Sequence, residues 1–536
     1  MIRRGSHKQS RKGKKKILTA FLCLAAGILF YAGGMARADG QNGEAVWDGP
    51  DVSAESYIVM DADSGEILIG KNVEEPLAPA SITKVMTAWI AAEQCLDLDA
   101  EVVVSDWAAN GIEVLSSTLV PPASAGERFS VRDLLYGLMM RSGNECANAL
   151  AEYAAGGEEA FAELMNEKAA AVGASKTHFV NAHGLDHEAH KTTAKDMALI
   201  TRAALQNETV RTLMSAQSYT IPKTNLTDAR VMQAGHQMVN GSIPLEGVYA
   251  GKTGYTVEAG WNLVTAASHG GRTLIAVTLR SDEGQNYEDT KTILSYVYDR
   301  IDGNEASPRP SLYDPRVERM SGDSFTVSWH AGNGISHVEC PVWTQENGQD
   351  DLVWQEGEIL GDRVYLTVEN DAHGGAYGGY QLQAIGYNPQ GEQTVSSVSI
   401  LFSGEETAAG GITEWNGNRY YVKENGLLAL GFLETEDGAY YLDPSTGVMQ
   451  TGWLVQNTTY FLGEDGKVQT GWLEQDGKTY YLKPSGDMAV GLQKIDGRIY
   501  SFGDDGVRRD GWPHLSLRPG LDRTAGEAAV RLRNRW

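Results

Sequence analysis

The fold of this chain is most readily inferred from the segment Pro79-Ala80-Ser81-Ile82-Thr83-Lys84-Val85-Met86-Thr87. It contains an S-x-x-K motif, and a helix that starts at Ser81 places Lys84 one turn later on the same face. A serine hydroxyl is a poor nucleophile until a base removes its proton, so we expect Ser81 to be the nucleophile and Lys84 its base. Free N–H groups at the helix N-terminus would favour a developing oxyanion. Apolar residues continue the helical period at Met86, Ile90 and Leu96.

Two further motifs follow in order: Ser142-Gly143-Asn144, an S-x-N, and Lys252-Thr253-Gly254, a K-T-G. Each motif alone is weak, because an S-x-x-K arises by chance about once or twice in a chain of this length. Taken singly, Ser81 would be a helix N-cap and Lys84 a solvated surface residue. The ordered trio instead resembles that of β-lactamases and penicillin-binding proteins. In it, Gly254 would let a substrate backbone approach closely.

The trio predicts a role for each polar side chain. Lys84 acts as a base only in its neutral form, which burial and the nearby Lys252 would both favour. Ser142 would pass the proton to the leaving amine, and Asn144 would hold the substrate amide. On a strand, Lys252 and Thr253 would bind the terminal carboxylate of the substrate.

The flanking residues resemble low-molecular-mass penicillin-binding D-alanyl-D-alanine carboxypeptidases. The matching segments are the S-x-x-K segment quoted above, Asn181-Ala182-His183-Gly184-Leu185-Asp186, Thr192-Thr193-Ala194-Lys195-Asp196-Met197-Ala198, Gly251-Lys252-Thr253-Gly254-Tyr255-Thr256 and Ala259-Gly260-Trp261-Asn262-Leu263. The resemblance covers about residues 50–301 and implies an α/β catalytic domain like that of the serine β-lactamases. It implies an acyl-enzyme on a D-Ala-D-Ala peptidoglycan stem peptide, release of the terminal D-Ala, and covalent inhibition by β-lactams. It also implies that the backbone N–H groups of Ser81 and Tyr255 form the oxyanion hole.

Local patterns agree with an α/β domain over residues 50–301. Alternating apolar residues at 57–60 and 66–69 flank a turn and predict a hairpin, and 261–264 pairs with 273–277 in another. Helices are expected over 131–153, interrupted at the S-x-N, and over 290–298.

The remaining chain divides into further predicted units. Residues 302–312 form a linker, and 313–403 show short alternating runs that predict a small β-sandwich. This segment resembles the Bsp-like repeat of Gram-positive surface proteins. A second linker spans 404–411, and the tail 513–536 has no assignable role.

Residues 412–512 repeat with a period near 20. The spacings between Gly431-Phe432, Gly452-Trp453, Gly471-Trp472, Gly491-Leu492 and Gly511-Trp512 are 21, 19, 20 and 20 residues. Such a period of hairpin and turn predicts a β-solenoid whose units stabilise one another by stacking.

These units resemble choline-binding or general cell-wall-binding repeats. The wall-ligand candidates are aromatic: Trp453, Trp472, Tyr460, Tyr480 and Tyr481. In the choline-binding repeats that these units resemble, a third aromatic residue precedes the tyrosine pair and helps to close a cage around the quaternary ammonium. Those places hold Arg419, Ala439, Thr459, Thr479 and Ile499. Choline, a wall carbohydrate or another teichoic-acid decoration therefore remain open as ligands, and the same rings also serve to pack the solenoid.

The N-terminus predicts export. Residues 1–16 hold eight Lys or Arg, an apolar run follows, and Ala36-Arg37-Ala38 is an A-x-A cleavage pattern. The run is short for a membrane span, so we expect a signal peptide over 1–38, cleaved after Ala38. Cys23 is not expected to carry a lipid, because bulky Leu22 precedes it. The predicted location is therefore extracellular and wall-associated, in a Gram-positive cell.

Cleavage would change the net charge from −25 to about −34, because residues 1–38 carry nine basic and no acidic residues. That charge disfavours nucleic acid and anionic membrane as partners. Three cysteines then remain, without CxxC spacing, so no disulfide framework is expected. Neither HExxH nor another paired metal spacing occurs, and neither a metal nor a cofactor is expected.

Two alternatives share parts of this pattern. A secreted serine β-lactamase carries the same three motifs, although the second is Ser-Gly-Asn here and wall-binding repeats suit a polymer substrate better. A catalytically inactive wall-binding surface protein would keep the repeats, but the intact trio argues against it.

Overall fold

The computed structural model describes residues 47–509, except 114, 305–308, 347, 406–408 and 457. The predicted signal peptide (1–38) and tail (513–536) lie outside these residues. Within the described part of the chain, no helix has the length and apolar character needed to cross a bilayer.

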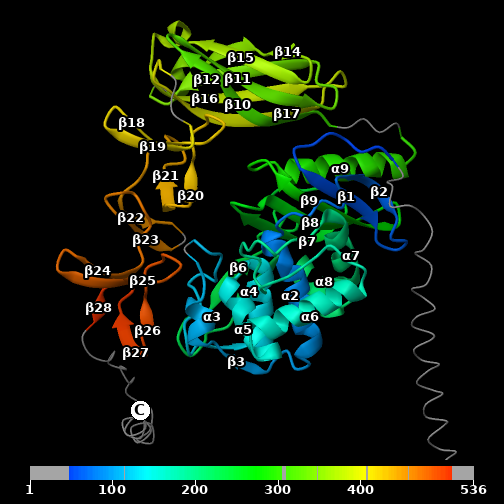
Figure 1. The fold of residues 1–536 in the computed structure, drawn as a ribbon, viewed down its shortest axis with the longest axis vertical. Coiled ribbons are helices and arrows are strands. Elements are labelled where there is room, and N and C mark those ends of the chain that lie inside the picture. The colour runs from blue at the N-terminus through cyan, green and yellow to red at the C-terminus, as the bar shows by residue number, and fades with distance from the viewer. Residues whose placement is uncertain are drawn as a thin grey trace, which may run out of the picture.

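The N-terminal α/β domain is built on one antiparallel sheet with the order β2-β1-β9-β8-β7 (Figure 1). Its strands are β1 (Ser56–Asp61), β2 (Ile67–Lys71), β7 (Val248–Thr256), β8 (Gly260–His269) and β9 (Arg272–Ser281). Both predicted hairpins are confirmed: Val59 pairs with Ile69, and Val264 with Val277. The strand that carries the K-T-G, β7, lies at an edge of the sheet, with one side paired to β8.

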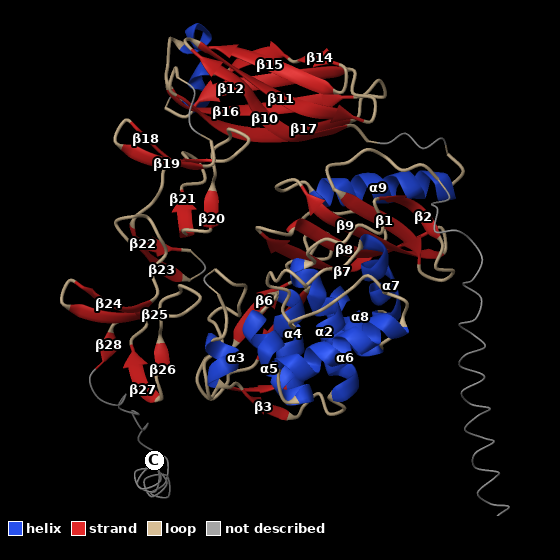
Figure 2. Ribbon diagram, in the orientation of Figure 1, coloured by secondary structure: helices blue, strands red, loops and turns tan. Residues whose placement is uncertain are grey.

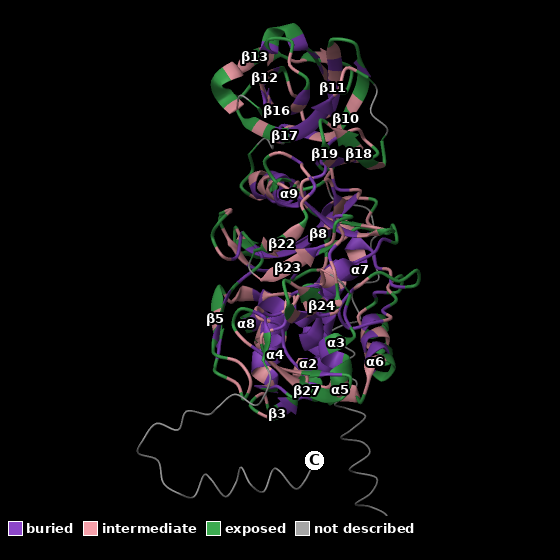
Figure 3. Ribbon diagram, turned by 90° about the vertical axis from the view of Figure 1, so that its left-hand side faces the viewer, coloured by how far each residue is buried: buried purple, intermediate pink, exposed green. Residues whose placement is uncertain are grey.

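Helices cover both faces of this sheet (Figure 2). They are α2 (Lys84–Gln94), α3 (Asp106–Asn110), α4 (Val131–Met140), α5 (Asn144–Ala155), α6 (Glu158–Ala171), α7 (Ala194–Ala204), α8 (Glu208–Ser215) and α9 (Asn286–Ile301). Because side chains alternate along a strand, Tyr57 and Val59 pack toward α9, whereas Ile58 and Met60 join the larger core on the other face. Figure 3 shows α2 and α4 as largely buried within that larger core.

Short elements complete the domain. Two small two-stranded sheets pair β3 (Glu101–Val103) with β4 (Arg128–Ser130), and β5 (Ser218–Ile221) with β6 (Arg230–Gln233). A capping box between Ser130 and Asp133 starts α4. The predicted break at the S-x-N is confirmed, since α4 ends at Met140 and α5 begins at Asn144.

The prediction of an α-helix from Ser81 is wrong in detail. Ser81 lies in a 3₁₀ turn, η1 (Ala80–Thr83), and the α-helix begins at Lys84. The chain enters this turn through Ala80 with φ +48°, a left-handed conformation that an α-helix cannot continue through. The helix also ends before Leu96, which is 92% exposed.

Residues 311–402 form two four-stranded sheets, β10-β11-β15-β14 and β13-β12-β16-β17. The strands are β10 (Ser311–Ser321), β11 (Ser324–Gly332), β12 (His337–Thr344), β13 (Val353–Glu356), β14 (Glu358–Leu360), β15 (Arg363–Glu369), β16 (Gly378–Tyr387) and β17 (Gln393–Phe402), with 3₁₀ turns η2 (Gly348–Asp351) and η3 (Asn370–His373). Phe325, Trp329, Tyr380 and Phe402 are fully buried between them. The predicted β-sandwich is confirmed.

The repeats form successive antiparallel hairpins. These are β18 (Gly411–Trp415) with β19 (Asn418–Val422), β20 (Gly431–Thr435) with β21 (Gly438–Leu442), β22 (Gly452–Val455) with β23 (Thr459–Leu462), β24 (Gly471–Gln475) with β25 (Lys478–Leu482), and β26 (Gly491–Ile495) with β27 (Arg498–Phe502) and β28 (Arg508–Arg509). Backbone bonds join each turn to an earlier hairpin: Met449 N donates to Arg419 O (2.7 Å) and Val468 N to Ala439 O (2.8 Å).

From the sandwich, the hairpins run down in one column alongside the α/β domain (Figure 1). Lys494 pairs with Asp106 at 2.7 Å, and Ser124 Oγ lies 3.2 Å from Gln493 Oε1. Leu115 N donates to Ser485 O at 3.1 Å. The repeats are therefore packed against the same domain that carries the three motifs.

Candidate active site

Ser81 and Lys84 are in direct contact. Lys84 Nζ donates to Ser81 Oγ at 2.7 Å, to Asn144 Oδ1 at 2.7 Å and to His183 O at 2.6 Å. The side chain of Lys84 has no solvent exposure. Burial, followed by the charge of Lys252, lowers the pKa of Lys84 well below its usual range. Burial therefore favours the neutral amine, whose two N–H groups can serve Asn144 Oδ1 and His183 O while its lone pair faces the Ser81 hydroxyl that it would deprotonate.

The other two motifs meet on the opposite side of the serine. Lys252 Nζ donates to Ser142 Oγ at 3.0 Å and to Thr253 O at 2.7 Å. Ser142 has φ +58°, so the backbone leaves its helical path between α4 and α5. The structure thus brings the S-x-x-K, the S-x-N and the K-T-G together, although their residues are separated by up to 173 positions in the sequence.

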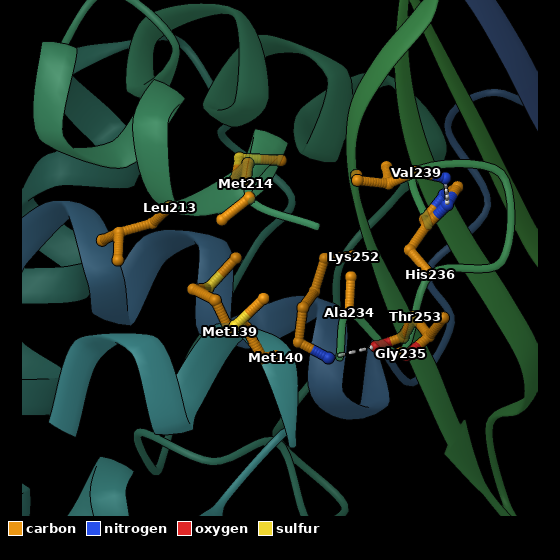
Figure 4. A pocket seen from close by; sticks show the side chains of 12 residues that line it. Met139, Met140, Leu213, Met214, Ala234, Gly235, His236, Val239, Lys252 and Thr253 are labelled. Atoms are coloured by element: carbon orange, nitrogen blue, oxygen red, sulfur yellow. Dashed lines mark hydrogen bonds between the residues drawn. The ribbon is translucent and has the colours of Figure 1, made fainter. Parts of the chain in front are cut away.

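Lys252 is set in an apolar wall. Figure 4 shows its side chain beside Met139, Met140 and Met214, which line the same small cavity. Burial lowers the pKa of Lys252 to about 7. Lys252 therefore titrates near neutral pH and is only 2% exposed.

A cleft with a volume of 440 Å³ opens over Ser81. Among the predicted site residues, those that line it are Ser81, Ser142, Asn144, Thr253, Gly254 and Tyr255. The two lysines lie behind this surface. Tyr255 is 51% exposed and packs on Trp261, with ring centroids 4.7 Å apart. Asn144 lines the cleft but is 2% exposed and its Oδ1 is bonded to Lys84, so its first contact is with the base.

Two polar contacts that hold the Ser81 turn were not predicted from the sequence. Asn262 Nδ2 donates to Ala78 O at 2.9 Å and to Pro79 O at 3.0 Å, and Asn262 Oδ1 accepts from Arg280 N at 2.7 Å. Thr83 Oγ1 lies 2.9 Å from His190 Nε2. Asn262 and His190 both lie in or beside the segments quoted above, but periodicity gives no sign of these long-range partners.

Glycines allow the backbone to close around the turn. A Cβ on Gly184, which has φ +89°, would lie 2.0 Å from Ala80 O. A Cβ on Gly254 would lie 3.0 Å from both Ile82 N and Pro79 O. The expected close approach at Gly254 is therefore to the Ser81 turn.

The predicted wall-ligand residues lie in aromatic clusters that join neighbouring hairpins. Trp453 contacts Tyr480 with ring centroids 4.7 Å apart, and Trp472 contacts Tyr481 at 5.1 Å. Tyr460 packs on Phe432 at 5.1 Å. Tyr460 and Phe432 also line the cleft over Ser81, a position that the repeat pattern did not predict.

No group of three or more metal-ligating side chains occurs among the residues that the structure describes.

Known proteins resemble the chain in three segments. The D-alanyl-D-alanine carboxypeptidase family model matches residues 44–283, the GBS Bsp-like repeat matches 319–399, and a cell wall binding repeat matches 470–488. D-alanyl-D-alanine carboxypeptidase DacC of Escherichia coli (strain K12) is 35% identical over 391 residues, which cover 67% of this chain and 92% of the relative. D-alanyl-D-alanine carboxypeptidase DacF of Bacillus subtilis (strain 168) is 31% identical over 367 residues, which cover 65% of this chain and 90% of the relative. A solved D-alanyl-D-alanine carboxypeptidase from Mycobacterium tuberculosis H37Rv is 32% identical, covers 48% of this chain and 94% of its own, and has a TM-score of 0.42.

These matches identify a serine-type carboxypeptidase of the penicillin-binding class. The chain belongs to the D-alanyl-D-alanine carboxypeptidase family, and it also carries a Bsp-like segment and cell wall binding repeats. The predicted family is confirmed, and so are the fold class of the catalytic domain and the multidomain organisation with β-rich C-terminal segments; the β-solenoid stays a prediction. A cell wall binding repeat fits an extracellular or wall-associated protein.

Proposed function

We propose that Ser81 attacks the carbonyl of the penultimate D-Ala of a peptidoglycan stem peptide. The Oγ–C bond forms, the C–N bond to the terminal D-Ala breaks, and water then hydrolyses the acyl-enzyme. The observation that carries this proposal is the 2.7 Å contact between Ser81 Oγ and the buried amine of Lys84. A neutral amine at that distance accepts the serine proton as the new bond forms.

The proton then moves to the leaving amine. Ser142 is suited to pass it on, because its hydroxyl lines the cleft and is held by Lys252 at 3.0 Å. The backbone N–H groups of Ser81 and Tyr255 would stabilise the oxyanion, since developing charge is best stabilised by donors already in place. The peptide's terminal carboxylate would lie against Thr253, with the charge of Lys252 behind it.

In this proposal, the predicted linkers at 302–312 and 404–411 separate the catalytic domain, the β-sandwich and the repeats, so that the repeats can have a role of their own. The repeats over 412–512 would hold the enzyme at the wall through the aromatic clusters of Trp453, Trp472 and Tyr480. The signal peptide over 1–38 would export it. The same catalytic chemistry would make β-lactams covalent inhibitors, because the nucleophile attacks their ring carbonyl.

The test is intact-protein mass spectrometry of residues 39–536 after incubation with benzylpenicillin. We expect a long-lived adduct that peptide mapping places on Ser81, and no adduct on Ser81→Ala. Ser116→Ala is the matched control, because Ser116 lines the same cleft but its hydroxyl has no hydrogen-bond partner among the described residues; it should keep the adduct.

Three results would contradict the proposal. An adduct on Ser81→Ala would remove Ser81 from the reaction. Rapid turnover to hydrolysed penicillin would favour the β-lactamase. The absence of both a penicillin adduct and D-Ala release from a stem pentapeptide would favour the inactive wall-binding protein.

A further inference from the structure

The cleft over Ser81 is not formed by the α/β domain alone. Its lining includes Phe432 and Glu434 from β20 and Tyr460 from β23, which belong to the second and third repeats. These residues share the cleft with Ser81 and Tyr255, although they lie more than 170 positions from the K-T-G in the sequence.

The repeats are seated on the loop that borders the cleft. Leu115 packs against an apolar cluster of Ala439, Tyr441, Leu462 and Val468, and its N–H donates to Ser485 O at 3.1 Å. Two residues later, Ser117 O accepts from Asn144 N at 2.8 Å. One short loop thus joins the core of the repeats to the S-x-N motif, so the repeats are part of the wall of the cleft.

We propose that the second and third repeats form an outer substrate subsite, in which Phe432, Glu434 and Tyr460 contact the stem peptide on the N-terminal side of the scissile bond. This inference rests on the proposed function. There the peptide's terminal carboxylate lies against Thr253, so the rest of the peptide can only extend away from it along the cleft. The repeats therefore select an extended peptide as well as attaching the enzyme to the wall.

The chemistry of this wall indicates what it prefers. Phe432 is 38% exposed and packs on Tyr441 and Tyr460, so it offers an apolar ring edge to a ligand. Glu434 and Glu113 both line the cleft. Desolvation, followed by the charges of Glu113 and Asp186, raises the pKa of Glu434. A peptide segment with a free amino group would relieve this repulsion, whereas an added carboxylate would increase it.

The experiment compares two soluble substrates that need different lengths of the cleft. One is N-acetyl-D-Ala-D-Ala, which reaches little beyond Ser81, and the other is the full stem pentapeptide. For Phe432→Ala in the full chain, we expect kcat/KM for the pentapeptide to fall about tenfold, because KM rises while kcat stays the same. Release of D-Ala from the dipeptide and the rate of Ser81 acylation by benzylpenicillin should change less than twofold.

Matched variants separate the subsite from general damage to the repeats. Ile412→Ala shortens the side chain at the equivalent position of the first hairpin, where it does not line the cleft, and should leave both substrates unaffected. Glu434→Gln is isosteric, so it should fold normally and lower kcat/KM for a pentapeptide with a free side-chain amine severalfold. Glu474→Gln is its control.

The inference would be overturned if Phe432→Ala and Glu434→Gln lowered kcat/KM equally for both substrates. It would also be overturned if they left kcat/KM for the pentapeptide unchanged. Failure of the proposed function gives a different result. In that case the wild-type chain itself would not acylate with benzylpenicillin or release D-Ala from either substrate.

Discussion

Lys84 and Lys252 place two amines in the interior within reach of hydroxyl groups. Burying a charged ammonium is costly, so burial lowers the pKa of Lys84 well below its usual range and that of Lys252 to about 7. Lys84 has three acceptors around it, whereas Lys252 has an apolar wall of Met139 and Met140 on one side. The chemistry proposed at Ser81 would thus depend on lysines whose burial is unfavourable for stability.

Replacing Lys252 with Met should stabilise the protein in a pH-dependent way. The pKa of about 7 in the folded state lies below the value of about 10.4 for an unfolded lysine. Between these values the unfolded chain binds more protons, so wild-type stability rises with pH by at most about 1.4 kcal/mol per pH unit. Lys252→Met lacks this dependence, and its advantage in the free energy of unfolding should be largest at pH 6 and shrink by pH 9.

Urea denaturation at pH 6, 7, 8 and 9 measures that difference. Lys478→Met, at an exposed position, is the control and should track the wild type at every pH. A constant difference between Lys252→Met and the wild type across this range would mean that Lys252 does not titrate in the folded protein as described.

At the scale of elements, the turn η1 is held between a strand and a loop. Asn262 on β8 binds the carbonyls of Ala78 and Pro79, and Gly184 closes on Ala80 from the other side. The edge strand β7 passes the same turn at Gly254. Ser81 is therefore positioned by contacts from three segments rather than by its own helix.

Gly184→Ala should displace this turn. A Cβ would lie 2.0 Å from Ala80 O, and φ +89° disfavours any side chain. We expect a loss of about 2–4 kcal/mol in the free energy of unfolding and at least a tenfold slower acylation by benzylpenicillin. Gly271→Ala is matched, because φ is +77° and nothing lies within 4 Å of the added Cβ; it should cost about 1–2 kcal/mol and leave acylation unchanged. Equal effects on acylation in the two variants would show that the contact with Ala80 does not position Ser81.

The motifs predicted the meeting of Ser81, Lys84, Ser142 and Lys252, because each chemical role requires its partner nearby. The β-hairpins and the broken helix followed from periodicity, which is a local property. The 3₁₀ turn at Ser81 could not be predicted from periodicity, because it depends on Asn262, more than 180 positions away. The cleft position of Tyr460 was missed for the same reason: repeats reveal how hairpins stack on one another and not which surface the stack is packed against.

At the scale of the whole molecule, the negative net charge of the chain opposes the proposed attachment to the cell wall. The chain carries −25, and about −34 without residues 1–38, while wall polymers with phosphate groups are also anionic. The long-range force between such a wall and this chain is thus repulsive, so the attachment proposed above would depend on short-range contacts in the aromatic clusters of the repeats.

This opposition predicts the salt dependence of wall binding. The screening length falls from roughly 30 Å at 0.01 M salt to about 8 Å at 0.15 M, which weakens the repulsion but hardly changes contacts between rings and a ligand. The fraction of residues 39–536 that sediments with purified Gram-positive walls should therefore rise about two- to threefold between these salt concentrations. A variant with Trp453→Ala and Trp472→Ala together should bind weakly at both. Binding that falls steadily as salt is added would instead mean that local positive charges attach the protein, and the aromatic clusters would lose their proposed role.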